Sequence, residues 1–290
     1  MGEAGRVLAV AGVVALAGLA LPSVGSAQSA DQPALKALRV CQDPNNMPFS
    51  NEKGEGIENK IAELFAKQLK VPVEYYSFPQ RMAFVRNTLR YRLPGEDYRC
   101  DVILGVPAGW GQASATKPYY TSTYALVFRK GEQFDDAKSG SDFLAKVQAM
   151  EKKPRIGLYD KSPGSAWLAK HGLVDAAVVY PIMSPDPEQF PGEIIAKDLA
   201  GKAIDVALVW GPIAGYYSTH VPNSEFTVVP LKSEPGVRFH YAIAMGVRYG
   251  EPKWKEQIEA LIDSNREALH RILEEYDVPL VDEQGELLRK

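Results

Sequence analysis

The sequence predicts an α/β protein of two lobes, in which each lobe is a mostly parallel sheet with flanking helices. Strand-like and helix-like segments alternate from Leu38 to Val106 and again from Arg155 to Trp210, as in two wound parallel sheets. A long amphipathic helix is expected from Trp254 to Leu273, after the second alternation. That helix needs a surface to pack on, so the chain is expected to return to the first lobe and to form two hinge crossovers.

The expected first lobe comprises residues 36–127 plus 240–290, and the expected second lobe comprises residues 130–236. Two strands, Tyr124–Phe128 and Tyr241–Gly246, would connect the lobes and leave a cleft between them. Loops that leave the carboxyl ends of strands line the ligand crevice of an open α/β sheet. We therefore expect binding residues on such loops.

The first lobe is predicted to begin in the order strand, helix, strand, helix, strand. Leu38–Cys41, Val73–Phe78 and Asp101–Val106 are short, largely apolar runs, and the last of them reads as a strand buried on both faces. Gln80-Arg81 opens the second helix. The first helix is predicted from apolar residues that fall on one face at helical spacing: Ile57, Ile61, Leu64, Phe65 and Leu69.

The second lobe repeats this alternation and then departs from it. Its elements are predicted as a helix through Phe143–Val147, a strand Arg155–Tyr159, a helix Ala166–His171, a strand Ala176–Tyr180, a helix through Ile194–Leu199 and a strand Ala203–Trp210. Phe226–Pro230 and Phe239–Val247 are further strands, separated by turn residues. The second of these would lead back into the first lobe.

Composition and charge exclude several classes of protein. The chain has 290 residues, of which 46% are hydrophobic and 24% charged, so it is neither disordered nor fibrous. Its formal net charge is -3, which gives no bulk attraction to nucleic acid or to an anionic membrane. Nucleic acid is therefore not expected as a partner.

The N-terminus has the organisation of a secretory signal peptide. Arg6 precedes an apolar run from Val7 to Leu21, and the small residues Gly25-Ser26-Ala27 follow the break at Pro22. We expect residues 1–27 to be removed and the mature protein to reside in a bacterial periplasm without stable membrane insertion. The alternative is an uncleaved anchor, but a run of about 15 residues is short for a bilayer span.

Two cysteines, Cys41 and Cys100, are present. An even number in an oxidising compartment favours a disulfide bond between them, and the alternative is a pair of buried free thiols. There is no Cys-x-x-Cys sequence, so neither a redox motif nor a zinc site is indicated.

Several stretches carry a family resemblance. Leu38-Arg39-Val40 with Asp43 and Pro48-Phe49-Ser50, Asp101–Gly105 with Pro118-Tyr119-Tyr120, and Asp205-Val206-Ala207 resemble three signatures of the amino-acid-binding branch of type II periplasmic solute-binding proteins. These proteins are the soluble receptors of ABC importers. The resemblance implies their two-lobed fold, with a ligand cleft between the lobes.

A narrower resemblance covers nearly the whole mature chain. Five segments are similar to the MxaJ/XoxJ proteins: Cys41–Asn51, Pro79–Arg81, Arg86–Arg90, Cys100–Pro107 and Pro118–Tyr124. That resemblance implies an accessory protein of methanol oxidation, which binds or helps to activate a pyrroloquinoline quinone (PQQ)-dependent methanol dehydrogenase. The quinone would belong to the partner, and no cofactor is expected in this chain. The alternative is an importer receptor for a small solute other than an amino acid.

The amino-acid-binding branch implies an Arg and an Asp that hold a zwitterion, and both anchors are missing. The loop Pro107–Lys117 contains no Arg, and the Asp205 strand ends in Trp210-Gly211. A buried zwitterion without such partners is unfavourable. The aromatic candidates for the cleft are Phe49, Trp110, Tyr119, Tyr120, Trp167 and Trp210, which suit an apolar ligand or a protein segment. For Trp110 and Trp210, packing between the lobes is an alternative role.

Polar candidates have structural alternatives too. Asp43, Asn45 and Asn46 either contact a ligand or only fix a turn, and Arg81 either reaches the cleft or is solvated. Ser165 belongs to a helix start, Ser162–Ser165, which either binds an anion or only caps the helix. The 4 His residues are scattered, and no catalytic or metal-ligand spacing occurs, so neither an enzyme nor a metal site is expected.

Overall fold

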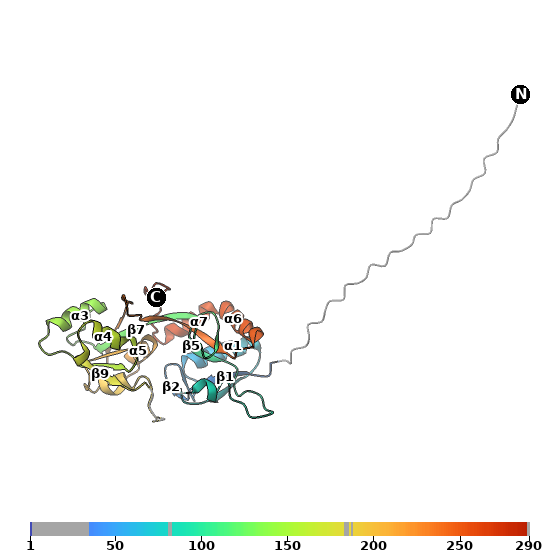
Figure 1. Ribbon diagram of the computed structural model, residues 1–290, viewed down its shortest axis with the longest axis horizontal. Coiled ribbons are helices and arrows are strands. Elements are labelled where there is room, and N and C mark those ends of the chain that lie inside the picture. Colours follow the sequence, from blue (N-terminus) through green and yellow to red (C-terminus); the bar gives the residue numbers. More distant parts are fainter. Residues whose placement is uncertain (2–34, 81–82, 183–185, 187, 289–290) are drawn as a thin grey trace. The chain divides into compact units, whose positions relative to one another are not determined.

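The computed structural model describes residues 1, 35–80, 83–182, 186 and 188–288 (Figure 1). Contacts divide the chain into Met1–Ala34 and Leu35–Lys290, and every element below belongs to the second unit. The expected signal peptide lies outside the described residues, Met1 excepted, and so does Arg81. Among the helices that the structure describes, none has the length and hydropathy needed to span a bilayer.

The first lobe begins with a strand, a helix and a second strand, as predicted. β1 (Leu38–Gln42) and β4 (Val73–Ser77) pair in parallel, and α1 (Ile57–Leu69) connects them. α1 buries Ile61 and Phe65, which belong to the apolar face that helical spacing predicted. This packing covers one side of the β1–β4 pair.

A tight loop separates β1 from α1. Its two short strands, β2 (Asn45–Asn46) and β3 (Ser50–Asn51), pair with each other. Gly56 ends the loop as the residue before α1, and a Cβ there would lie 2.1 Å from the Phe49 carbonyl oxygen. Only glycine fits so close an approach of the two backbones, and the loop is thereby held against the start of α1.

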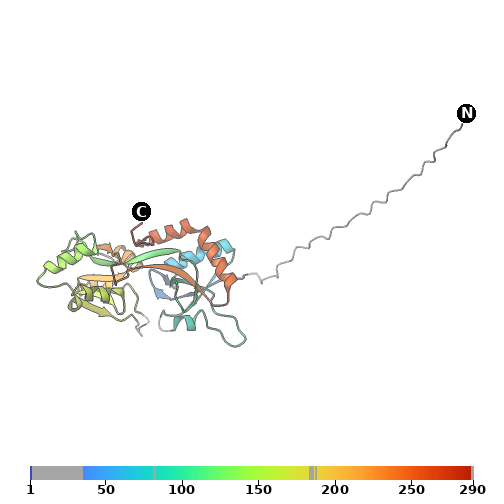
Figure 2. The same cartoon turned by 45° about the horizontal axis from the view of Figure 1, so that its top comes forward.

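An eight-stranded sheet runs through both lobes in the order β5, β12, β7, β10, β8, β9, with β11 paired to β7 and β6 paired to β12. Its strands are β5 (Ile103–Pro107), β6 (Ser114–Ala115), β7 (Tyr120–Arg129), β8 (Ile156–Tyr159), β9 (Ala177–Tyr180), β10 (Val206–Trp210), β11 (Phe226–Pro230) and β12 (His240–Val247). β7 pairs with β12 through residues 120–123 and with β10 through residues 124–128. β7 therefore crosses between the lobes, and Figures 1 and 2 show it spanning both.

The second lobe covers its part of the sheet with helical segments. They are α3 (Gly140–Ala149), α4 (Pro163–Lys170), the 3-10 turn η1 (Val174–Ala176), the short π-helix η2 (Ile194–Leu199) and α5 (Gly211–Thr219). Sequence patterns did not predict α5, because Gly211-Pro212 and Gly215 are typical of turns. Tertiary packing favours the helix: a Cβ at Gly215 would lie 2.0 Å from the Asp277 carbonyl oxygen, so glycine lets the two segments touch.

The C-terminal segment forms two helices, α6 (Pro252–Ser264) and α7 (Arg266–Glu275), and the prediction of one long helix was wrong. The break falls at Asn265, whose Nδ2 donates to the Leu261 carbonyl oxygen at 2.7 Å. A short polar side chain that bonds the backbone in this way competes with helical hydrogen bonds. α7 packs on α1, and Leu273 belongs to the same hydrophobic core as Ile61 and Phe65 of α1.

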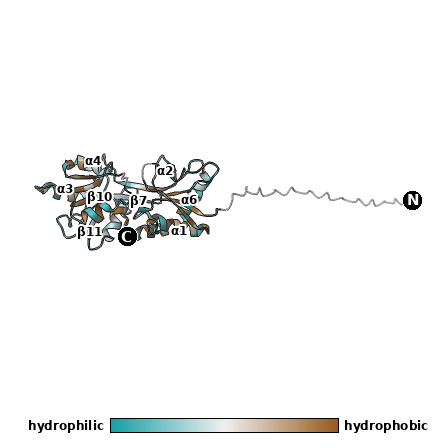
Figure 3. Cartoon of the chain, turned by 90° about the horizontal axis from the view of Figure 1, so that it is seen from below, coloured by the Kyte–Doolittle hydropathy of each residue, from teal (hydrophilic) through white to brown (hydrophobic). Residues whose placement is uncertain are grey.

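Separate hydrophobic cores lie on the two sides of the crossover. One core joins α1, α6 and α7 to β1, and a smaller one includes the short helix α2 (Phe84–Asn87). Two other cores lie among the helices and strands of the second lobe. Figure 3 shows hydrophobic and hydrophilic residues alternating along helices such as α1 and α3, as expected for helices that cover a sheet. The lobe boundaries given above stay a prediction, which these separate cores support.

A disulfide bond joins Cys41 to Cys100, with the sulfur atoms 2.11 Å apart and the Cα atoms 5.3 Å apart. Next to it, Val40 and Val102 form a parallel bridge. The bond therefore fixes β1 to the segment that leads into β5, and Gly105 and Pro107 of β5 line the cleft described next.

Candidate functional site

Two adjoining cavities lie between the lobes, and we call them together the cleft. The first has a volume of about 370 Å³ and the second about 340 Å³. Both are lined by Asn46, Phe49, Gln80, Tyr124 and Trp210. The first is lined also by Asp43, Asn45, Tyr159, Ser162, Pro181, Ile182, Asp186, Gln189, Phe190, Pro191, Leu208 and Ile213. The second is lined also by Glu58, Gly105, Pro107, Tyr120, Tyr241 and Ile243.

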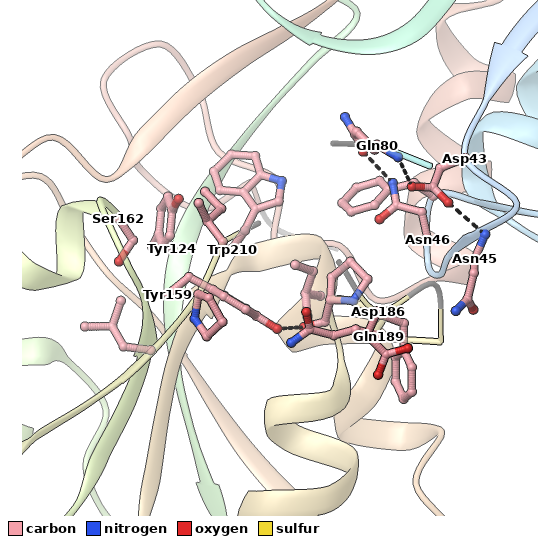
Figure 4. A pocket seen from close by; sticks show the side chains of 17 residues that line it. Asp43, Asn45, Asn46, Gln80, Tyr124, Tyr159, Ser162, Asp186, Gln189 and Trp210 are labelled. Carbon is pink, nitrogen blue, oxygen red and sulfur yellow. Dashed lines mark hydrogen bonds between the residues drawn. The ribbon is translucent and has the colours of Figure 1, made fainter. Parts of the chain in front are cut away.

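A polar group from the first lobe forms one wall of the first cavity (Figure 4). Asp43 Oδ1 accepts a hydrogen bond from the backbone amide of Asn45 at 2.9 Å, and Asp43 Oδ2 accepts one from the backbone amide of Gln80. Asn46 Nδ2 donates to Gln80 Oε1 at 2.7 Å. Asn45 Nδ2 reaches across to the Glu188 carbonyl oxygen at 3.2 Å. These side chains fix the turn after β1 and at the same time border the cavity.

Three aromatic rings lie together in the cleft, and we call Tyr124, Trp210 and Tyr241 the aromatic triad. The Tyr124 ring centre lies 5.4 Å from that of Trp210, and the Tyr241 centre lies 6.1 Å from that of Trp210. All three rings meet edge to face, an attractive arrangement for aromatic side chains. Burial raises the pKa of Tyr124 to about 12, so its phenol stays neutral at ordinary pH.

Glu58 lies in the second cavity, near the start of α1. Burial, and then the neighbouring Asp43 carboxylate, raise the pKa of Glu58 to about 7. The group influences its surroundings in turn, because burial and the charge of Glu58 raise the pKa of Tyr120. Glu58 is thus a carboxyl group that can change its charge near neutral pH inside an aromatic cavity.

Ser162 lines the first cavity at the second-lobe end. The residue is 8% exposed, and its Oγ has no hydrogen-bond partner among the residues that the structure describes. It is the residue before α4, and no backbone amide donates a hydrogen bond to its side chain. A buried hydroxyl without a partner is unfavourable, and a polar ligand in the cavity would satisfy it.

Comparison with known proteins places the chain in a family, although no protein-family model matches it. Over 293 residues, the chain is 28% identical to Protein MoxJ of Methylorubrum extorquens, covering 93% of this chain and 93% of that protein. It is 25% identical over 272 residues to Protein MoxJ of Paracoccus denitrificans, covering 84% of this chain and 89% of that protein.

A solved structure decides the assignment. The crystal structure of the periplasmic binding protein XoxJ from Methylobacterium extorquens AM1 is 39% identical, with a TM-score of 0.68, and the match covers 85% of this chain and 100% of that one. The chain belongs to the MxaJ/XoxJ family. The expected resemblance is therefore confirmed, and with it the two-lobed type II periplasmic binding protein fold.

Six residues predicted for the cleft of this MxaJ/XoxJ-family protein do line it: Asp43, Asn45, Asn46, Phe49, Tyr120 and Trp210. They come from the loop after β1, from the start of β7 and from the end of β10. Two of these places are carboxyl ends of strands, where an α/β fold gathers binding residues. Whether these residues bind a ligand or partner stays a prediction.

Four other predicted residues do not line either cavity. Trp167 is 0% exposed and belongs to the second-lobe core, so its prediction as a cleft residue was wrong. Its indole Nε1 donates to Glu234 Oε1 at 2.8 Å, which satisfies the buried donor. Tyr119 packs on the first-lobe core and donates to the Leu104 carbonyl oxygen at 2.9 Å. Trp110 packs against the small first-lobe core that contains Cys41 and Cys100. Ser165 is exposed on α4.

Sequence reasoning missed several residues that line the cleft. Glu58 is typical of acidic residues in the first turn of a helix, so the pattern gave no reason to place it in a cavity. Tyr124 and Tyr241 were assigned to crossover strands, and only the pairing of those strands shows which rings face the cleft. A usable signal existed for Tyr241, because aromatic residues at hinge strands adjoin any cleft between lobes.

Proposed function

We propose that the protein is a periplasmic accessory protein of methanol oxidation, which binds or helps to activate a PQQ-dependent methanol dehydrogenase. Membership of the family of MoxJ and XoxJ supports this role. The quinone would be held by the dehydrogenase, and this chain would act by binding rather than by catalysis. The predicted signal peptide would direct export to the periplasm and would then be removed.

One observation in the cleft carries the proposal. Among the described residues that line the two cavities there is no Lys and no Arg, whereas seven are aromatic: Phe49, Tyr120, Tyr124, Tyr159, Phe190, Trp210 and Tyr241. A receptor for free amino acids needs a cation for the ligand carboxylate. An aromatic surface of this kind is typical of contact with a protein segment or an apolar group.

Association with the dehydrogenase can be tested by native mass spectrometry of the purified proteins. We expect a complex with the unaltered chain and at least a tenfold weaker one with Trp210→Ala. Tyr249→Ala is the matched control, because Tyr249 is an aromatic residue that is 59% exposed and does not line either cavity. Failure of the unaltered protein to bind the dehydrogenase would overturn the proposal. Equal binding by both variants would move the interface away from the cleft.

A second function is an importer receptor for a small solute other than an amino acid. The buried Ser162 Oγ favours it, since this hydroxyl lacks a partner and lines a cavity large enough for a small ligand. Native mass spectrometry of the protein purified from its own periplasm distinguishes the two functions. A retained small molecule without dehydrogenase association would favour the receptor.

A further inference from the structure

We propose that the second cavity binds a positively charged nitrogen group, an ammonium or a guanidinium, between the Glu58 carboxylate and the aromatic triad. The inference names the ligand chemistry of the cleft in the proposed function. The inference shares only the cleft with the proposed function, and it can be tested without the dehydrogenase.

The lining of the second cavity has the chemistry that recognises cations. Its described lining includes one acidic side chain, Glu58, and five aromatic side chains, Phe49, Tyr120, Tyr124, Trp210 and Tyr241. A cation over an aromatic ring is attracted by the negative face of the ring, and several rings around it form the cage used for ammonium ligands. A carboxylate in the same cavity adds a charge-assisted hydrogen bond.

Among the residues that the structure describes, none is a partner of the Glu58 carboxylate that would compete with such a ligand. Within the described part of the chain, no side chain or amide donates a hydrogen bond to the Glu58 carboxylate and no cation forms an ion pair with it. Its backbone amide donates to the Phe49 carbonyl oxygen at 2.8 Å, so the main chain at this position is fixed while the carboxylate is available.

Among the described residues, the titratable groups that interact electrostatically with Glu58 are all acids. Asp43 comes from the loop after β1, Tyr75 from β4, Tyr119 from the residue before β7, and Tyr120 from the start of β7. A cation is therefore the ligand charge that this environment lacks. Burial without such a cation raises the pKa of Glu58 to about 7, and a bound cation would lower that pKa again. Binding should then release a proton near neutral pH.

Gly105 leaves room for the Glu58 carboxylate. A Cβ at this position would lie 2.3 Å from Glu58 Oε1, so the missing side chain makes room for the carboxylate beside β5. The carboxylate thus lies against β5, and Trp210 and Tyr241 line the same cavity. A ligand nitrogen that enters between the rings would meet it.

The charged nitrogen can come from a free amine or from a Lys or Arg side chain of a protein partner. The probes that separate these sources are methylammonium, n-butylammonium and Nα-acetyl-lysine amide, each titrated at constant ionic strength against sodium chloride. Preference for the first two assigns the site to a free amine, and preference for the blocked lysine assigns it to a partner side chain. Either preference supports the shared chemistry.

The test uses the purified protein at pH 8, followed by tryptophan fluorescence and calorimetry. We expect saturable binding of at least one probe, at least tenfold weaker binding by Glu58→Gln, and several-fold weaker binding by Tyr241→Leu. Glu52→Gln is the matched control, because Glu52 is exposed in the first lobe and does not line either cavity. Melting temperatures show whether each variant is folded.

Lowering the pH adds an independent readout. Between pH 7.5 and 5.5 the affinity of the unaltered protein should fall about tenfold or more as Glu58 takes up its proton, and the affinity of Glu58→Gln should stay flat. Absence of saturation with every probe, or equal affinity of Glu58→Gln and the unaltered protein, would overturn the inference. Dehydrogenase binding in the same samples reports separately on the proposed function.

Discussion

Glu58 Oε1 lies so close to the Gly105 α-carbon that a Cβ on residue 105 would come within 2.3 Å of it. The two residues come from different elements, α1 and β5, and both line the second cavity. The contact involves the far end of a flexible side chain, so an added methyl group would move the carboxylate rather than the backbone. A substitution at Gly105 should therefore change binding in the cleft without destabilising the fold.

We predict that Gly105→Ala displaces the Glu58 carboxylate and weakens cation binding at least fivefold, with little change in melting temperature. Titration with n-butylammonium and circular dichroism melting would measure the two effects. Gly109→Ala is the matched comparison, because a Cβ at Gly109 meets nothing within 4 Å, although its φ of +77° makes that substitution strained. Unchanged binding by Gly105→Ala would contradict the assigned position of Glu58.

Trp167→Ala is expected to destabilise the protein by about 3 to 5 kcal/mol, the usual cost of removing a fully buried large aromatic side chain. Trp167 is 0% exposed, and the substitution would also leave Glu234 without its indole donor. Trp210→Ala should cost clearly less, because Trp210 is only half-buried at the cleft. Denaturant unfolding of both variants measures the difference, and equal losses would show that Trp210 is a core residue.

Glu234 predicts a pH dependence of stability. Burial opposes its ionisation, but hydrogen bonds donated by Lys170, Trp167 and His171 outweigh burial and lower the pKa of Glu234 to about 2. Because this pKa is below the unfolded value of 4.5, the ionised group stabilises the fold above pH 4.5. That contribution is lost as the pH falls from 4.5 toward 2.

The measurement is the melting temperature of Glu234→Gln relative to the unaltered protein at pH 7 and at pH 3. We expect the variant to be less stable at pH 7 and the difference to shrink at pH 3. Glu96→Gln, which changes an exposed glutamate of the first lobe, should show no such convergence. A difference that grows at low pH would contradict the hydrogen-bond assignment.

Reduction of the Cys41–Cys100 bond should lower the free energy of unfolding by about 2 to 4 kcal/mol, because it removes a cross-link from the unfolded chain. The bond spans 59 residues of sequence and lies beside the first-lobe core. The double variant Cys41→Ser, Cys100→Ser should show the same loss and no further response to reductant. Equal stability with and without reductant would show that the bond contributes nothing.

Local sequence patterns determined most of the fold. Short apolar runs predicted the main strands, since burial on both faces of a sheet leaves a direct record in composition. The helical spacing of Ile57, Ile61 and Phe65 predicted α1, because the buried face of a helix repeats at that spacing. Turn-like residues concealed α5, and a side-chain hydrogen bond at Asn265 divided the C-terminal helix. Such effects depend on neighbours that are distant in sequence or on a single side-chain conformation.

Some residues of the candidate site could likewise be predicted from the sequence, and others could not. The sequence by itself indicated the loop after β1 and the aromatic end of β10, because strand ends and turn residues are local features. Only the tertiary structure decided that Trp167 is core and that Glu58 lies in a cavity with Tyr124, Trp210 and Tyr241. These side chains come from α1, β7, β10 and β12, and their proximity depends on strand pairing and helix packing across the crossover, which one residue's neighbours in sequence do not specify.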